Sequence, residues 1–235
     1  MAISSFAKRA LAVAVMAAGL SACGSDDDTV VVLPPDTLDF EVTVYNDTAA
    51  QPLSPVVVGI HSATMSLWSV GLSASVPLET MAEGGNADDL AAMFTDTNVA
   101  VLGAGAIGPG NYEKLMISAE DRTEMKLSLA SMMVNTNDAF TGLNAIDVSG
   151  LMVGDSMSYT LPAYDAGTEA NSEAMGSIPG PADGGEGFNA ARDDTMNKVS
   201  RHPGLVTQAD DAMSVLLPDH RISGTVGRVV ITRTN

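Results

Sequence analysis

Alternating apolar and polar side chains from Phe40 onward constrain the fold of this chain more than any other feature. Phe40, Val42 and Val44 fall on one face of an extended backbone, and polar or aromatic residues separate them. This period of two predicts a half-buried β-strand that ends at Asn46-Asp47. Because such a strand buries its apolar face only within a sheet, a β-rich domain is expected.

Further segments have the apolar, β-branched character of strands, with turn-forming residues between them. They are residues 56–61, 98–102, 114–118, 124–134, 156–164 and 222–234. The polar turn at 120–122 predicts that segments 114–118 and 124–134 pair as an antiparallel hairpin. Many strands with little helix favour an all-β fold, an antiparallel β-sandwich with one or two short helices.

Residues 86–94 form the clearest helical segment. Asn86 suits the N-cap position, and two acidic residues follow in the first turn. Leu90, Met93 and Phe94 recur at helical spacing. We expect one short amphipathic helix here, covering an open end of the sheets.

The charge balance excludes two classes of partner. The 235 residues include 29 acidic and 11 basic side chains, for a formal charge of −18. Nucleic acids and anionic lipid surfaces both attract cationic proteins, so neither is an expected partner. Solubility accounts for most of this acidity, and the length suits one domain with a sizeable core after a processed leader.

Residues 1–22 have the features of a secretion signal. Lys8 and Arg9 supply the positive start, and residues 10–20 form an apolar run too short for a stable membrane span. The run ends in Leu-Ser-Ala followed by Cys23, which resembles the bacterial lipobox. In that motif the cysteine thiol is lipidated and becomes the first residue of the mature protein.

Cys23 is therefore the expected lipidation site, and the alternative is an ordinary cleavage site with an incidental cysteine. It is the only cysteine of the chain, so no disulfide forms within the chain. We expect residues 1–22 to be a lipoprotein signal peptide, 23–39 a lipidated tether and 40–235 the folded domain. Gly24 follows the cysteine, and by resemblance to enterobacterial sorting it indicates an outer-membrane lipoprotein of the cell envelope.

Three carboxylates stand where strands are expected to end. Asp138 follows the apolar run that ends at Val134, and Asp165 and Glu169 follow the strand at 156–164. Gly167 allows the loop between the last two to bend. Turn formation alone explains such residues in many loops. The alternative is a cation site, because carboxylate oxygens at strand ends are suitable ligands for calcium.

Five ordered stretches resemble the spondin domain, the amino-terminal module of F-spondin and mindin and of many bacterial lipoproteins. They are FEVTVYNDTAAQPLSP from Phe40, HSATMSLWSVGLSAS, LSLASMMVNTNDAFTGL, YDAGTEANSE with IPGP, and GTVGRVVITR near the end. The DAGTE run is the most specific. Tyr164 replaces the tryptophan of the animal domains, and their cysteines are missing, so their partners do not transfer to this chain.

The resemblance favours a non-enzymatic, cell-surface binding module of adhesion type, in which the loops around Asp138, Asp165 and Glu169 hold the expected calcium ion. Its expected partner is a cell-surface or extracellular protein or glycan. One alternative is a glycoside hydrolase with Asp165 and Glu169 as paired carboxylates, although residues four apart in one loop rarely flank a substrate. The other is a structural envelope protein without a ligand.

Overall fold

The computed structural model describes residues 36–235 except 122, 195 and 223. The predicted signal peptide, Cys23 and nearly all of the predicted tether lie outside these residues. In the described part, no helix is long and apolar enough to cross a membrane.

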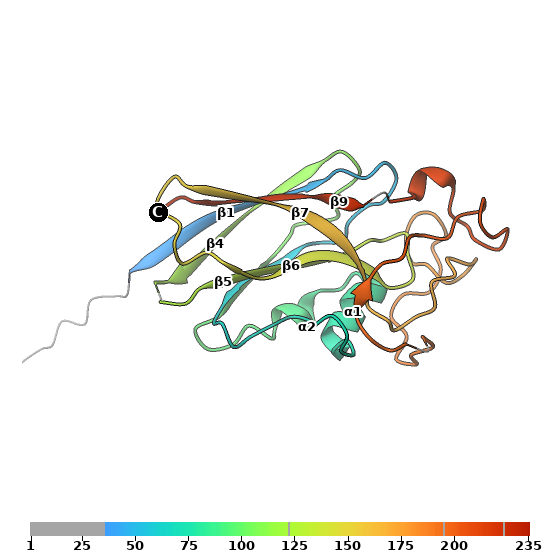
Figure 1. Ribbon diagram of the computed structural model, residues 1–235, viewed down its shortest axis with the longest axis horizontal. Coiled ribbons are helices and arrows are strands. Elements are labelled where there is room, and N and C mark those ends of the chain that lie inside the picture. Colours follow the sequence, from blue (N-terminus) through green and yellow to red (C-terminus); the bar gives the residue numbers. More distant parts are fainter. Residues whose placement is uncertain (1–35, 122, 195, 223) are drawn as a thin grey trace, which may run out of the picture. The chain divides into compact units, whose positions relative to one another are not determined.

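Antiparallel strands make up most of the domain, which confirms the all-β prediction (Figure 1). The strands are β1 (Thr37–Asn46), β2 (Val57–His61), β3 (Val99–Leu102), β4 (Tyr112–Glu120), β5 (Lys126–Met132), β6 (Ala139–Asp147), β7 (Ser156–Asp165), β8 (Ser200–Arg201) and β9 (Thr225–Arg233). Their order is β3-β2-β5-β6-β7-β9-β1-β4, and the short β8 pairs with β7.

Strand β7 connects the two layers of this sandwich. Its residues 156–162 pair with β9 in the layer that also contains β1 and β4. Its last residues, 163–165, pair with β6 in the layer that also contains β5, β2 and β3. The layers are thus two parts of one hydrogen-bonded sheet, and β7 reaches the end of the molecule where the long loops lie (Figure 1).

The core between the layers follows the alternation predicted from the sequence. Phe40, Val42 and Val44 of β1 are fully buried, opposite Val58 and Ile60 of β2. The period-two pattern therefore assigned the inward face of β1 correctly.

A second apolar cluster covers the outer face of the layer formed by β2, β5 and β6. It contains Ala130 and Phe140 from the strands, together with Leu78 and Met81. The last two belong to helix α1 (Val76–Gly84), which packs on this face with α2 (Asp88–Ala91). Both faces of this layer are buried, so even the polar side chains Ser128, Ser131 and Thr141 of its strands are shielded from solvent.

The helices differ from the predicted segment 86–94. Only α2, four residues long, forms within it. Helix α1 begins after the N-cap Ser75, whose side chain accepts the N–H of Leu78, and it ends at Gly85, which has a φ of 71°. This serine cap and left-handed glycine are strong helix-end signals, and they enclose the longer helix.

The predicted hairpin of residues 114–118 and 124–134 is wrong. Strand β4 pairs with β1, whereas β5 pairs with β2 and β6, so the two strands lie in different layers. The chain therefore passes from one layer to the other between Glu120, the end of β4, and Lys126, the start of β5. Local turn chemistry does not distinguish such a crossing from a hairpin, because both need the same polar residues.

Candidate functional site

The ends of β6 and β7 bring two of the predicted site residues together. Ala139, the first residue of β6, lies opposite Asp165, the last residue of β7. Asp138 immediately precedes β6, and its carbonyl accepts the N–H of Ala166 at 3.3 Å. Both side chains are buried, with 0% exposure for Asp138 and 5% for Asp165.

Asp138 organises the loop that follows β7. Its Oδ2 accepts the N–H of Thr168 at 2.8 Å, the hydroxyl of Thr168 at 3.2 Å and the N–H of Glu169 at 3.1 Å. Its Oδ1 is buried and has no hydrogen-bond partner. The Oδ2 of Asp138 therefore anchors the loop, while its Oδ1 remains available to accept a hydrogen bond or to bind a cation.

Asp165, the last residue of β7, also holds this loop in place through hydrogen bonds. Its Oδ1 accepts the N–H of Gly167 at 2.7 Å, and its Oδ2 accepts the side-chain amide of Asn171 at 2.6 Å. Gly167 has a φ of 71°, and a Cβ there would collide with the backbone of Lys198. The predicted bend thus requires glycine for both its conformation and its close approach.

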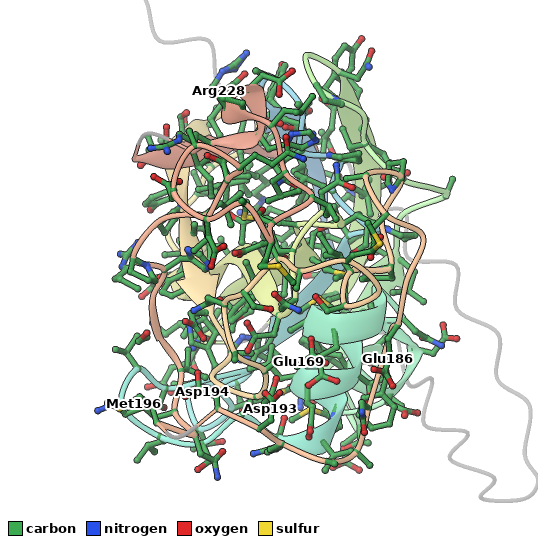
Figure 2. The ribbon with its side chains drawn as sticks, turned by 90° about the vertical axis from the view of Figure 1, so that its right-hand side faces the viewer. Glu169, Glu186, Asp193, Asp194, Met196 and Arg228 are labelled. Atoms are coloured by element: carbon green, nitrogen blue, oxygen red, sulfur yellow. The ribbon has the colours of Figure 1, made fainter. Side chains whose placement is uncertain are left out.

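Glu169 lies against helix α1, as Figure 2 shows at the loop end of the molecule. Burial raises the pKa of Glu169 to about 8, and the negative charge of Glu83 adds to this rise. Glu83 extends from α1; its Oε2 accepts the N–H of Asn189 at 2.9 Å, and its Oε1 is buried without a partner. The carboxylates of Glu83 and Glu169 therefore lie close enough to interact, although they are far apart in the sequence.

Glu173 is a second carboxylate that the sequence analysis missed. It is fully buried and has a φ of 42°, which is strained for a side chain of this kind. Its Oε2 accepts the N–H of Val206 at 3.2 Å, whereas its Oε1 has no partner. The Oδ1 of the neighbouring Asn171 is likewise buried and unpartnered.

We call these five acidic residues the carboxylate cluster. It comprises Glu83, Asp138, Asp165, Glu169 and Glu173.

Burial, together with the charges of neighbouring carboxylates, disfavours ionisation of Glu83, Asp138, Glu169 and Glu173. Burial raises the pKa of Asp138 to about 7, with a further contribution from the charge of Asp165. Burial raises the pKa of Glu173 to about 7, and the charges of Asp138 and Asp165 add to it. Burial also raises the pKa of Glu83. Raised pKa values of this kind are typical of carboxylates that lie close together in a buried, poorly solvated site.

The basic groups near the cluster do not balance its charge. Arg192 forms an ion pair with Glu79 at 2.5 Å, and its effect on the pKa of Glu83 is smaller than that of burial. Burial lowers the pKa of His202, against the opposing effect of Asp165, so its imidazole is neutral at pH 7. The cluster therefore has excess negative charge when its members ionise.

A cation is one way to satisfy these groups. Within the described ranges, no three His, Cys, Asp or Glu side chains are arranged so as to hold a metal ion as they stand. The donor set nevertheless fits a hard cation, because Asp138, Asn171 and Glu173 each present a buried oxygen without a partner. The predicted set of Asp138, Asp165 and Glu169 stays a prediction.

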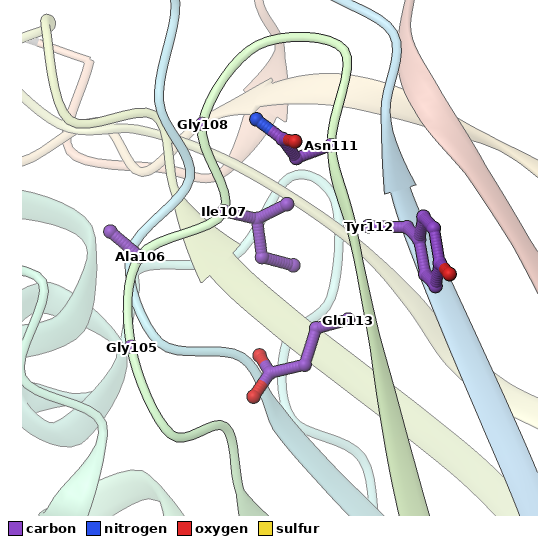
Figure 3. Close-up of a pocket in the computed structure, with 7 residues that line it drawn as sticks. All are labelled: Gly105, Ala106, Ile107, Gly108, Asn111, Tyr112 and Glu113. Atoms are coloured by element: carbon purple, nitrogen blue, oxygen red, sulfur yellow. The ribbon is translucent and has the colours of Figure 1, made fainter.

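A pocket of about 290 Å³ lies elsewhere, beside the glycine-rich loop before β4 (Figure 3). Glu113 turns toward the loop, and its Oε1 accepts the N–H of Ala104 at 2.6 Å, while Tyr112 points the other way. The lining residues are Gly105, Ala106, Ile107, Gly108, Asn111, Tyr112 and Glu113. A single carboxylate among them gives no acid–base pair, so we assign this pocket no chemistry.

A known protein family matches the part of the chain that contains the carboxylate cluster. The Spondin_N family model matches residues 44–177, more than half of the chain. The chain belongs to the spondin domain family. The match covers every member of the carboxylate cluster, whereas the last stretch that suggested the resemblance, in β9, lies beyond it. No curated protein matches the chain.

Membership in this family indicates an extracellular domain of binding or adhesion type. The spondin domain here places its carboxylate cluster at the end of the sandwich that also carries the long loops between β7 and β9. Loops at one end of a rigid sandwich are a common location for binding sites.

Proposed function

We propose that this spondin domain is a non-enzymatic, cell-surface binding module whose carboxylate cluster holds a calcium ion. The ion stabilises the loops after β7, and these loops contact a cell-surface or extracellular protein or glycan. Lipidation of Cys23 anchors the module to the outer membrane.

One observation carries the proposal of a cation: buried acceptor oxygens without partners occur in and beside the cluster. Three belong to its members Glu83, Asp138 and Glu173, and the fourth belongs to Asn171, whose amide donates to Asp165. An unpartnered buried charge costs several kcal/mol, and native proteins rarely keep such groups without an ion or a proton. Calcium favours six to eight oxygen ligands, so loop carbonyls and water would complete its shell.

Calorimetric titration tests the proposal. Full-length protein in mild detergent is stripped with chelator and titrated with calcium, and magnesium serves as the comparison. We expect saturable binding of calcium at millimolar concentrations or below, together with a rise in melting temperature that chelator reverses. Absence of both effects at millimolar calcium overturns the proposal.

The burial of the cluster argues against the glycosidase alternative. Asp138 is fully buried and Asp165 nearly so, and both accept hydrogen bonds that hold the loop. Carboxylates in such positions do not flank an exposed glycosidic bond. A panel of glycosidase substrates is expected to give no turnover, and a turnover lost in Glu169→Gln would refute this part of the proposal.

A further inference from the structure

Two methionines stand out on the loops between β7 and β9. Met175 is 83% exposed and Met213 is 72% exposed. Methionine is a flexible and polarizable side chain that adapts to varied apolar partners. Exposure of two such side chains at one place therefore indicates a contact surface rather than core filling.

The backbone places these two methionines across from each other. Ala174 and Ser214 form an antiparallel bridge, and the N–H of Val215 donates to the carbonyl of Glu173 at 2.9 Å. Met175 follows Ala174, and Met213 precedes Ser214, so both lie on the same side of this bridge. We call the two residues the methionine pair.

The pair is held by a hydrogen-bonded framework. Ser214 and Leu216 are buried, whereas Met213 and Leu217 on the same run are exposed. The hydroxyl of Ser214 donates to the carbonyl of Val206 at 2.9 Å. The apolar side chains are thus directed outward by an ordered segment, which reduces the entropy lost on binding.

Acidic residues surround the methionine pair. Asp211 Oδ1 accepts the N–H of Met213 at 2.9 Å, and Asp183 Oδ2 accepts the N–H of Gly176 at 2.6 Å. The N–H of Glu186 donates to the carbonyl of Gly176 at 2.9 Å. The chain as a whole carries a formal charge of −18. The surface is therefore apolar at its centre and negative at its rim.

We propose that the methionine pair binds a protein partner through a basic segment that also carries apolar side chains. Lysine and arginine side chains combine an apolar stem with a cationic head, which matches an apolar centre and an acidic rim. A second copy of this chain is disfavoured, since it would bring two strongly negative surfaces together. The proposal does not require calcium in the carboxylate cluster.

A designed amphipathic peptide tests this surface. Its leucine face is combined with lysines, and a matched peptide has glutamates in place of the lysines. Fluorescence anisotropy with full-length protein measures both. We expect binding of the lysine peptide only, weakened by salt and roughly tenfold weaker for Met175→Ser/Met213→Ser, because hot-spot side chains dominate affinity.

Met152→Ser is the matched control. Met152 is 69% exposed, but it lies on the loop between β6 and β7, where the N–H of Gly154 donates to the carbonyl of Arg233 near the end of the chain. This variant is expected to bind as the parent does. Glu186→Gln is expected to weaken binding and its salt dependence without a change in melting temperature.

Three outcomes overturn the proposal. Equal binding by the parent and the double serine variant shows a general electrostatic attraction. Equal binding of the lysine and glutamate peptides shows that the rim does not select for charge. Self-association in sedimentation that disappears in the double variant identifies a second copy as the occupant.

Discussion

Ala139 of β6 lies directly opposite Asp165 of β7. This one pairing brings Asp138 beside Asp165, although 27 positions separate them in the sequence (165 − 138 = 27). It also directs the loop after β7 across Asp138, whose Oδ2 accepts two backbone N–H groups and a hydroxyl from it.

Without calcium, the domain is expected to lose stability as the pH rises from 5 to 8.5. The pKa of Asp138 and that of Glu173 are raised to about 7, and that of Glu169 to about 8. A raised folded-state pKa means that the folded protein binds more protons than the unfolded chain, so its contribution is lost as the pH rises through that value. Urea denaturation in chelator measures the trend.

Calcium is expected to reverse that trend, because the proposed site would bind it through ionised carboxylates. The calcium-induced rise in melting temperature is therefore larger at pH 8 than at pH 5. At about 100 times its dissociation constant, calcium adds roughly 2.7 kcal/mol to the free energy of unfolding. A rise that is equal at both pH values contradicts the role of these carboxylates.

Asp165→Asn is expected to remove most of the calcium-induced rise in melting temperature. The amide keeps an oxygen for the N–H of Gly167 but loses the charge that attracts the ion. Differential scanning fluorimetry with and without calcium measures it. Glu120→Gln, at the exposed end of β4, is the control and should behave as the parent does.

Glu173→Gln should change stability and calcium binding in opposite directions. Removing a buried carboxylate with an unpartnered oxygen is expected to stabilise the calcium-free domain at pH 8 by about 1 kcal/mol. The same change removes a candidate ligand and weakens calcium binding. Urea denaturation measures the change in stability, and calorimetry on the same preparation measures the change in calcium affinity. A destabilised calcium-free protein would show that the carboxylate of Glu173 already has a favourable partner.

Gly167→Ala is expected to destabilise the domain by about 1–3 kcal/mol. The φ of 71° is unfavourable for alanine, and the added Cβ meets the backbone of Lys198. Gly105→Ala is the control, since its Cβ would meet nothing within 4 Å. A comparable denaturation midpoint for both variants argues against a fixed loop.

Cys23→Ser tests the proposed anchor. The serine hydroxyl does not replace the thiol in lipidation, so we expect an unprocessed precursor or release into the soluble fraction. Mass spectrometry and membrane fractionation measure these outcomes. Unchanged mass and membrane partitioning rule out the lipid anchor, and mature protein in the inner membrane contradicts the proposed outer-membrane location.

The sequence by itself predicted most of the strands and the family, although it missed β6 and the short β8. Alternation at Phe40, Val42 and Val44 is a local property of the backbone, and it predicted the buried face of β1. The DAGTE run identified the loop that follows β7. Asp138 and Asp165 were also found in this way, because turn residues after an apolar strand occupy sheet ends in most pairings.

Tertiary structure decided the partners of these elements. Strand β4 pairs with β1, and β5 pairs with β2 and β6, so consecutive strands lie in different layers. Glu83 and Glu173 joined the cluster only through the packing of α1 and the bridge at Ala174. Their spacing in the sequence carries no signal, because long-range packing, rather than local conformational preference, determines which carboxylates share a buried environment.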